Sequence, residues 1–521
     1  MAQDKKNAPP GNDNVAPIDF ALYSSFLAYQ APLPVSFIAA MHGLGRGPLT
    51  GKFTYALLGV RDVTPLAVLA DSYPEATFIG VSADPVAVEH GQTLPREAGL
   101  SNLTIKEGPL SGNGLPECDM IVLSRLYSAL PPDERQEILA GLSKRLKPGG
   151  ILSIQYSALP GAASSDMLFN FLREMSASFE GDAATRLVGA VGRAVDLARG
   201  EAFVFRQFPA AAEVLQRMAQ SDPRIGAADV FNTGKHGLYV TEVMREIEPT
   251  GLVYAGNGQL PLNLLELGLP QALRASAEAI KTVPARELYL DYARNAQVRA
   301  DIYVKPMDGG ARDPADLFSD FLIMRFSTGP ETLRRQQIAQ NTGVDFTAGL
   351  YTDLLAALSA EPRSVAALLE EPALRKHARA RVVKAIQLLV GAEMAALARV
   401  KLSPPEGFMP DQVRLTSKLN RVLLDGNLDH PEMVPFATPL TGQRLLLSLG
   451  QRLNLHALLG GDLDKAYAAL SARGLELKDN NGKAAGVEEF KNSLISELPK
   501  YRVQDGAVLR AMGILADGTI Q

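Results

Sequence analysis

The stretch 53–70, FTYALLGVRDVTPLAVLA, has the order of a nucleotide-binding turn, with an apolar strand, a glycine and then a helix. Such a turn can hold a ligand when glycines let the backbone approach it and the helix start offers free N–H groups. Gly59 stands at the first glycine position, but Arg61 and Val63 stand where two more glycines are expected. The stretch therefore indicates a cofactor site, or a site that has lost its cofactor.

Strands and helices alternate around this turn. Apolar runs predict five strands, at 55–60, 77–81, 103–108, 119–125 and 151–156. The helices between them open with Pro or Asp-Pro, and the helix over 131–146 also ends in Lys and Arg. This alternation predicts an α/β fold with a mainly parallel sheet and helices on both faces. Ligands of such sheets bind outside the carboxyl ends of the strands, here 59–63, 81–84, 107–110 and 123–127.

The rest of the chain reads as mostly helical. Helical spacing covers 164–200, and a mixed, mainly helical stretch follows to about 325, where MDGGARDPAD (307–316) is typical of a linker. The last third predicts short helices, one of them over GQRLLLSLGQRL (442–453), and a polar loop at 478–486. A length of 521 residues suggests roughly three domains.

Composition excludes several classes of protein. A net charge of -5 argues against nucleic acid as a partner. Cys118 is the only cysteine, and the six histidines show no HxxxH or HExxH spacing, so we expect no metal. The sequence contains no run of 18 apolar residues, so no membrane-spanning helix is predicted. The polar residues 1–18 read as a disordered tail without a signal peptide, so the cytoplasm is the expected location.

Three separated stretches carry a resemblance to one family. A resemblance to class I S-adenosylmethionine (SAM) methyltransferases is carried by the stretch LKPGGILSIQY, which follows an amphipathic helix. The bacterial members that carry a methyltransferase regulatory domain are resembled by the longer stretch RLYSALPPDERQEILAGLSKRLKPGGILSIQYSALPG. Protein-lysine methyltransferases of outer-membrane proteins belong to that group. The regulatory domain is resembled by two stretches, HGLYVTEVMREIEPTGLVYAGNGQLP and ARELYLDYARNAQVRADIYV. The C-terminal domain is resembled by FATPLTGQRLLL.

The resemblance implies a domain order and a cofactor. It places a Rossmann-like methyltransferase domain at 19–163, a helical or mixed regulatory domain at 164–330 and a mostly helical C-terminal domain at 331–521. The implied cofactor is SAM, and the implied partner is a protein substrate or a protein that is bound without being modified.

The family's cofactor motif is altered in this chain. The pattern apolar-apolar-Glu-apolar-Gly-Cys-Gly-Asp-Gly places Leu57 at the acid and Gly59 at the first glycine, keeps Asp62, and puts Arg61 and Val63 at the other glycines. Val63 is β-branched and tolerates positive φ badly.

The next two strands also lack the family's acids. Ser82 stands at the acid that would bind the ribose, and Asp84 lies two residues on, which is the same face of an extended strand. Pro109 stands at the acid of the third strand.

These changes lead to two hypotheses. Each lost charge-assisted contact costs about 1.5–3 kcal/mol, so three losses would take a micromolar site to millimolar or weaker. The first hypothesis is therefore a degenerate methyltransferase that acts by binding a protein partner. The alternative is an active, divergent SAM-dependent protein (lysine) methyltransferase in which Asp84 and backbone groups hold the cofactor. A third idea, an anionic metabolite beside Arg61, rests on that arginine and the helix start at Thr64.

Methyl transfer to an amine needs positioning more than a nucleophile from the protein. Tyr127 and Tyr156 stand at the ends of the fourth and fifth predicted strands and could orient the amine. The other interpretation is a half-buried ring with its hydroxyl at the surface. Asp291, Tyr292 and Arg294 share helical spacing, and an ion pair that fixes domain packing is expected there.

Overall fold

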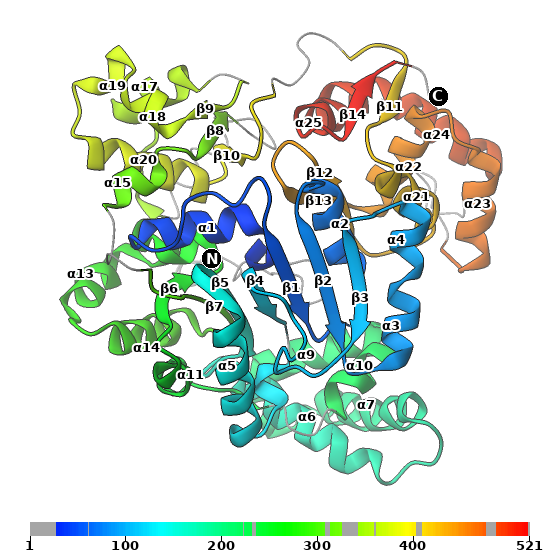
Figure 1. Cartoon of the computed structure of the whole chain (residues 1–521). Coiled ribbons are helices and arrows are strands. Elements are labelled where there is room, and N and C mark those ends of the chain that lie inside the picture. The colour runs from blue at the N-terminus through cyan, green and yellow to red at the C-terminus, as the bar shows by residue number, and fades with distance from the viewer. Residues whose placement is uncertain are drawn as a thin grey trace, which may run out of the picture.

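A computed structural model of the chain describes residues 28–518 (Figure 1). Within that span the description omits residues 61, 125, 222, 232–235, 308–312, 326–341, 348, 359–360, 403–408 and 476–485. The expected tail at 1–18, Arg61, half of the expected linker and most of the polar loop at 478–486 lie outside the described residues.

A seven-stranded sheet forms the centre of the molecule, with the order β3-β2-β1-β4-β5-β7-β6. Its first five strands pair in parallel, and β7 pairs antiparallel with both β5 and β6. All five strands predicted from the sequence are present, and the α/β fold is confirmed. The strands are β1 (Thr54–Leu58), β2 (Thr77–Ser82), β3 (Leu103–Glu107), β4 (Cys118–Leu123), β5 (Leu146–Ser157), β6 (Val253–Asn257) and β7 (Val298–Val304).

Side chains that alternate along the strands build a separate core on each face of the sheet. Tyr55 and Leu57 of β1 belong to one apolar cluster, and Ala56 and Leu58 belong to another. The first cluster includes α2 (Thr64–Ser72), and the second includes α5 (Pro132–Arg145). Also on or beside the sheet lie η1 (Ala28–Gln30), α1 (Pro32–Met41), α3 (Pro85–Gly91), α4 (Thr93–Ala98) and η2 (Tyr127–Ala129).

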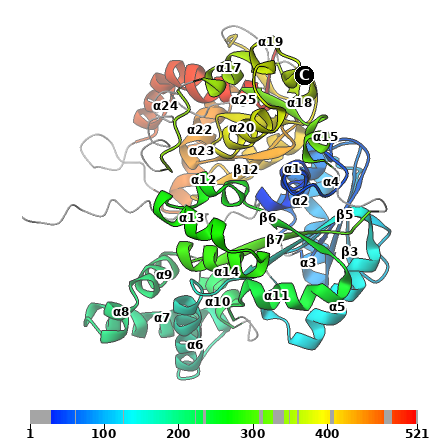
Figure 2. The same ribbon diagram turned by 90° about the vertical axis from the view of Figure 1, so that its left-hand side faces the viewer.

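Five helices follow β5 and form a helical unit with a small core of its own, built on residues such as Leu172, Leu187 and Leu215. They are α6 (Ala163–Ser176), α7 (Ala183–Arg199), α8 (Phe203–Gln207), α9 (Pro209–Gln220) and α10 (Pro223–Val230). The unit extends away from the sheet (Figure 2).

The chain then returns to the sheet through α11 (Val240–Ile247), η3 (Glu248–Thr250) and β6. Next come η4 (Leu260–Asn263), α12 (Leu265–Gly268), α13 (Gln271–Ala279) and α14 (Val283–Arg294), before β7. Residues 253–304, which the resemblance assigns to the second domain, thus supply two strands of the central sheet.

The last third begins with a small three-stranded sheet and its helices. These elements are α15 (Pro314–Phe318), β8 (Leu322–Arg325), α17 (Leu350–Ala357), β9 (Arg363–Ser364), α18 (Val365–Leu369), α19 (Pro372–Arg375), α20 (Arg379–Gly391) and β10 (Ala395–Ala398). They build a separate apolar cluster, to which Phe37 of α1 also belongs.

The final part holds two strand pairs and several helices. They are β11 (Val413–Leu415), α21 (Lys418–Asp425), β12 (Val434–Thr438), β13 (Gln443–Leu447), α22 (Leu449–Leu458), α23 (Leu463–Ala472), α24 (Val487–Tyr501), η5 (Arg502–Gly506), α25 (Ala507–Ala511) and β14 (Leu515–Asp517).

The prediction of one helix over 442–453 is wrong in its first half. Residues 443–447 form β13, which pairs with β12 in a hairpin. Gly442 has a φ of +62°, which suits the tight turn before β13. The helix starts only after Ser448, whose side chain and that of Gln451 form a capping box.

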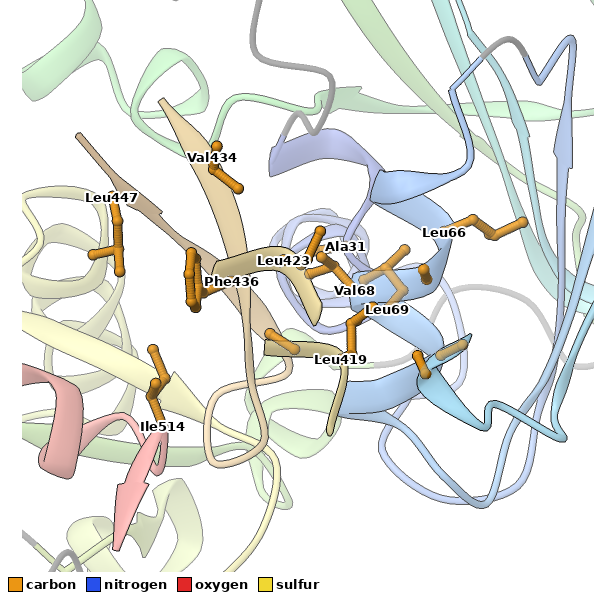
Figure 3. Close-up of a cluster of buried hydrophobic side chains, with 14 of the residues drawn as sticks. Ala31, Leu66, Val68, Leu69, Leu419, Leu423, Val434, Phe436, Leu447 and Ile514 are labelled. Carbon is orange, nitrogen blue, oxygen red and sulfur yellow. The ribbon is translucent and has the colours of Figure 1, made fainter. Parts of the chain in front are cut away.

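Helix α2, which directly follows the Gly59 turn, lies between the sheet and the C-terminal part of the chain. Leu66, Val68 and Leu69 of α2 share one apolar cluster with side chains of α21, β12, β13 and β14 (Figure 3). The contributing C-terminal side chains include Leu419, Leu423, Val434, Phe436, Leu447 and Ile514. Seven of the nine residues of α2 are buried. The helix is therefore held from both sides.

Candidate ligand site at the switch point of the sheet

The sheet has a switch point between β1 and β4, because the chain leaves these neighbouring strands toward opposite edges. Crevices at such points bind the ligands of open α/β sheets. Gly59 follows β1 and Ser124 follows β4, so these residues flank the switch point. The carbonyl oxygen of Ser124 lies 3.7 Å from the place that a Cβ on Gly59 would take. We treat this edge as the candidate site.

Gly59 supplies a backbone shape that other residues rarely adopt. Its φ is +78°, and the N–H groups of Gly59 and Val60 both donate to the carbonyl of Val81, at 2.9 and 3.0 Å. The side chain of Leu126 packs directly on this turn, with its Cδ1 2.2 Å from the place of a Cβ on residue 59. Leu57, at the expected acid position, is 4% exposed and belongs to the core. The space beside the glycine is therefore taken by protein.

The other cofactor-binding candidates make local contacts. Asp62 accepts a hydrogen bond from the N–H of Thr64 at 2.9 Å, at the start of α2. Ser82 is buried, and its Oγ accepts the N–H of Asp84 at 3.2 Å. Asp84 is exposed, and its carbonyl accepts the N–H of Val88 at 3.1 Å in the first turn of α3. These contacts shape the two strand-to-helix turns, and a role in cofactor binding stays a prediction for all of these residues.

Three residues at this edge were missed by the sequence reasoning. Gln30 donates from Nε2 to the Oγ of Ser124 at 3.3 Å, and Ser124 donates to the Oε1 of Gln155 at 3.4 Å. The hydroxyl of Tyr55 fixes the carbonyl of Gln30 at 3.0 Å. Gln30 is 2% exposed, and its Oε1 has no hydrogen-bond partner among the described residues. The position of Ser124 at a strand end is the sequence signal that could have indicated this group. Gln30 carries no such signal, because it lies 94 residues away along the chain.

Tyr127 and Tyr156 lie inside the molecule. Their rings are 6.3 Å apart between centroids, and both are almost fully buried. Tyr127 donates to Glu246 of α11, and Tyr156 donates to Asp301 of β7 at 2.5 Å. Burial raises the pKa of both phenols, and the neighbouring carboxylates raise it further. The interpretation that these tyrosines are half-buried, with their hydroxyls at the surface, is therefore wrong. Their role in orienting an amine stays a prediction.

Glu246 also receives a second, charged donor. The Nε of Arg135, on α5, lies 3.0 Å from Oε2 of Glu246, and its Nη1 donates to the carbonyl of Leu130 at 3.0 Å. Arg135 is 1% exposed, so this pair is fully desolvated on the arginine side. The contact joins α11 to the helix that follows the switch point.

Arg299 of β7 lies at the centre of a second buried network. It reaches Asp291 at 2.5 Å, Asp301 at 2.8 Å and Glu287 at 2.9 Å. Its Nη2 also donates to the hydroxyl of Tyr254 at 2.8 Å. Because Asp301 accepts from Tyr156, the network ties the end of β5 to α14.

The acids of this network differ in pKa. Burial raises the pKa of Asp291 to about 7 and raises that of Asp301. Burial acts in the same direction on Glu287, but the charge of Arg299 and hydrogen bonds together lower its pKa.

The expected cluster on α14 is rearranged. Asp291 pairs with Arg299, whereas Arg294 donates to the carbonyls of Gly268 and Leu262 at 2.8 and 2.9 Å. Tyr292 is 57% exposed. The expected ion pair thus involves Asp291 alone of the three residues, and the sequence spacing could not supply its partner from β7.

The described part of the chain offers little for metal chemistry or for crossing a membrane. No group of three or more His, Cys, Asp or Glu in it is arranged to hold a metal ion. None of the helices described there has both the length and the apolar character needed to cross a membrane. Cys118 is buried, and burial raises the pKa of its thiol to about 11, which keeps it protonated at neutral pH.

Comparison with known proteins agrees with the architecture. Residues 227–305 match the family model of a predicted methyltransferase regulatory domain. The structure of PKMT2 from Rickettsia typhi in complex with AdoHcy superposes with a TM-score of 0.64 at 17% identity, over 95% of this chain and 99% of that one. A second PKMT2 structure from the same organism gives a TM-score of 0.62 at 17% identity, over 94% and 99%.

The fold is thus that of the class I SAM-dependent methyltransferases. Within this fold, residues 227–305 match the regulatory-domain model, in agreement with the resemblance.

Two curated relatives are uncharacterized proteins. One, from Synechocystis sp., is 25% identical over 54% of this chain and 56% of its own length. The other, from Rickettsia prowazekii, is 31% identical over 27% of this chain and 57% of its own length. The chain thus spans little more than half the length of these relatives.

Proposed function

We propose that this protein is a degenerate methyltransferase, which binds SAM weakly or not at all and acts in the cytoplasm by binding a protein partner. The observation that carries the proposal is the contact of Leu126 with the Gly59 turn. In this fold that turn must lie open to the methionine end of the cofactor. Here the neighbouring side chain is a leucine, and the acid position of β1 is the buried Leu57.

The second turn supports the same proposal. Ser82 offers a hydroxyl where a carboxylate would accept both ribose hydroxyls, and that hydroxyl is engaged by the N–H of Asp84. The residues present therefore do not fit SAM in the manner that the resemblance implies. The regulatory and C-terminal parts, at 164–330 and 331–521, would supply the surface for the partner.

The alternative is an active, divergent protein (lysine) methyltransferase. It is favoured by two observations, the exposure of Asp84 just after β2 and the similar fold of PKMT2, which was solved with AdoHcy. In this version Asp84 holds the ribose, and Tyr127 or Tyr156 orients the amine after a change in their hydrogen bonds.

Titration calorimetry with SAM and with AdoHcy separates the two. We expect dissociation constants of about 1 mM or weaker for the natural chain. Leu126→Ala should tighten binding several-fold if the leucine blocks the turn, and Leu110→Ala is a control at another strand end. Micromolar binding by the natural chain, with transfer of labelled methyl groups to any protein, would refute the proposal. The alternative fails if Asp84→Ala leaves SAM binding unchanged.

A further inference from the structure

A short segment after β4 connects the Gly59 turn to helix α11. Leu126, whose side chain packs on that turn, is the residue that caps η2, and its carbonyl accepts the N–H of Ala129 at 2.8 Å. The backbone of Leu126 is therefore placed by η2. Its side chain is half-buried and packs against the apolar cluster that also contains Val243 and Ile247 of α11.

Two hydrogen bonds from the residues that match the regulatory-domain model, 227–305, hold η2 in place. The hydroxyl of Tyr127, the first residue of η2, donates to the carboxylate of Glu246 on α11. The N–H of His236 donates to the carbonyl of Ser128 at 3.3 Å. The segment that places Leu126 is thus held by a part of the chain more than 100 residues further on.

The contact between Tyr127 and Glu246 is reinforced by a charge. The Nε of Arg135 lies 3.2 and 3.0 Å from the two carboxylate oxygens of Glu246, and its Nη1 donates to the carbonyl of Leu130, just after η2. Both Tyr127 and Arg135 are almost fully buried. Hydrogen bonds to a charged group are stronger than neutral ones, and a buried charge that loses its partner is costly. Movement of η2 therefore requires that a strong buried contact opens.

We propose that α11 keeps the Gly59 turn closed, because Glu246 holds η2 and η2 holds Leu126 against the turn. Glu246 and Tyr127 are positioning residues in this arrangement, since they act through Leu126. The inference rests on the proposed function, because it takes Leu126 as the side chain that weakens SAM binding. A ligand that needs the open turn must displace Leu126, so the contact between Tyr127 and Glu246 opposes its binding. By linkage, a change that moves α11 away from η2 favours the ligand.

Titration calorimetry of the full chain with AdoHcy tests the proposal. Tyr127→Phe deletes one hydroxyl and leaves Arg135 paired with Glu246, and we expect it to tighten AdoHcy binding about tenfold relative to the natural chain. Glu246→Gln should also tighten binding, because a neutral amide no longer forms the charged pair with Arg135. Circular dichroism melts verify that each variant is folded, and either variant alone can carry the test.

The matched control is Tyr254→Phe. The hydroxyl of Tyr254 donates to Glu287 at 3.0 Å and accepts from Arg299 at 2.8 Å, so this variant also removes a hydroxyl from a group of one tyrosine, one glutamate and one arginine. That group joins β6 to α14 and β7 and does not include η2. Tyr254→Phe should therefore leave AdoHcy binding unchanged, and a gain equal to that of Tyr127→Phe would overturn the proposal.

A double variant separates this inference from the proposed function. Once Leu126→Ala has removed the side chain that η2 holds, adding Tyr127→Phe should tighten AdoHcy binding no further. The inference is overturned if the two gains add, or if Leu126→Ala tightens binding while Tyr127→Phe and Glu246→Gln do not. In that second case the proposed function still stands. Micromolar binding of AdoHcy by the natural chain would overturn both, since the turn would then already be open.

Discussion

The side chain of Leu126 lies against the backbone of Gly59, with Cδ1 2.2 Å from the place that a Cβ on residue 59 would take. The two residues follow β4 and β1, the strands on either side of the switch point. A glycine is therefore needed here for two reasons: its φ is positive, and the side chain of Leu126 approaches it closely. A turn that in this fold opens toward a ligand is here part of the packing.

Replacement of Gly59 by Ala should destabilise the protein by about 1–3 kcal/mol, because the new methyl group meets Leu126 and φ is +78°. Urea unfolding measures the loss. The control is Gly192→Ala in α7, where a Cβ meets nothing within 4 Å, and it should stabilise the protein by about 0.5–1 kcal/mol. Equal effects of the two substitutions would contradict the packing seen at Gly59.

Arg299→Met should cost about 3–5 kcal/mol in unfolding free energy, since it leaves buried Asp291, Asp301 and Glu287 without their shared cation. Arg193→Met is the matched control, because Arg193 is 65% exposed and its pair with Asp196 spans 3.6 Å. That substitution should change stability by less than about 0.5 kcal/mol. If Arg299→Met proves as mild as the control, the network does not hold β7 to α14.

Asp291 should make stability fall as pH rises from about 4 to about 7. Burial raises its folded pKa to about 7, while an unfolded aspartate has a pKa of about 3.9. In this window the folded state holds a proton that the unfolded state has released, so its contribution, complete below pH 4, is lost toward pH 7. The slope is at most about 1.4 kcal/mol per pH unit.

Urea unfolding of the natural chain and of Asp291→Asn across this pH window isolates the contribution. The groups around Asp291 are Arg299, Asp301 and Glu287, and they are common to both proteins. Asp182→Asn offers a control of opposite sign at lower pH, because the N–H of Thr185 lowers the pKa of Asp182, so that its contribution to stability is gained as pH rises toward about 4 and is constant above it. A difference between the natural chain and Asp291→Asn that does not vary with pH would rule out the raised pKa.

Phe436→Ala should destabilise the protein by about 3–5 kcal/mol, because Phe436 of β12 is fully buried in the cluster that covers α2. Met433→Ala, three residues earlier, removes a side chain that is 46% exposed and should cost less than about 1 kcal/mol. Thermal unfolding monitored by circular dichroism compares them. A small effect at Phe436 would mean that the C-terminal part does not depend on its contact with α2.

The first five strands of the sheet were predictable, because buried parallel strands are continuous apolar runs bounded by helix signals. The start of α22 was predicted too early because polar and apolar residues do not alternate clearly over Gln443–Leu447, as they would on a strand with one solvent-exposed face. Its partner β12, and the turn at Gly442, decide the hairpin. Tyr156 lies near the end of β5 as predicted, whereas Tyr127 lies in η2, after the end of β4. Their carboxylate partners are 119 and 145 residues away along the chain.

The sequence alone determined the α/β order, the glycine at the first turn and the absence of acids at positions 57 and 82. These features depend on neighbours within a few residues, so they can be read from local pattern. Tertiary structure alone decided that Leu126 fills the turn, that Gln30 joins Ser124 and Gln155, and that β7 brings Arg299 to three acids. Those contacts join segments far apart in the chain, and burial sets their strength, so no local pattern contains them.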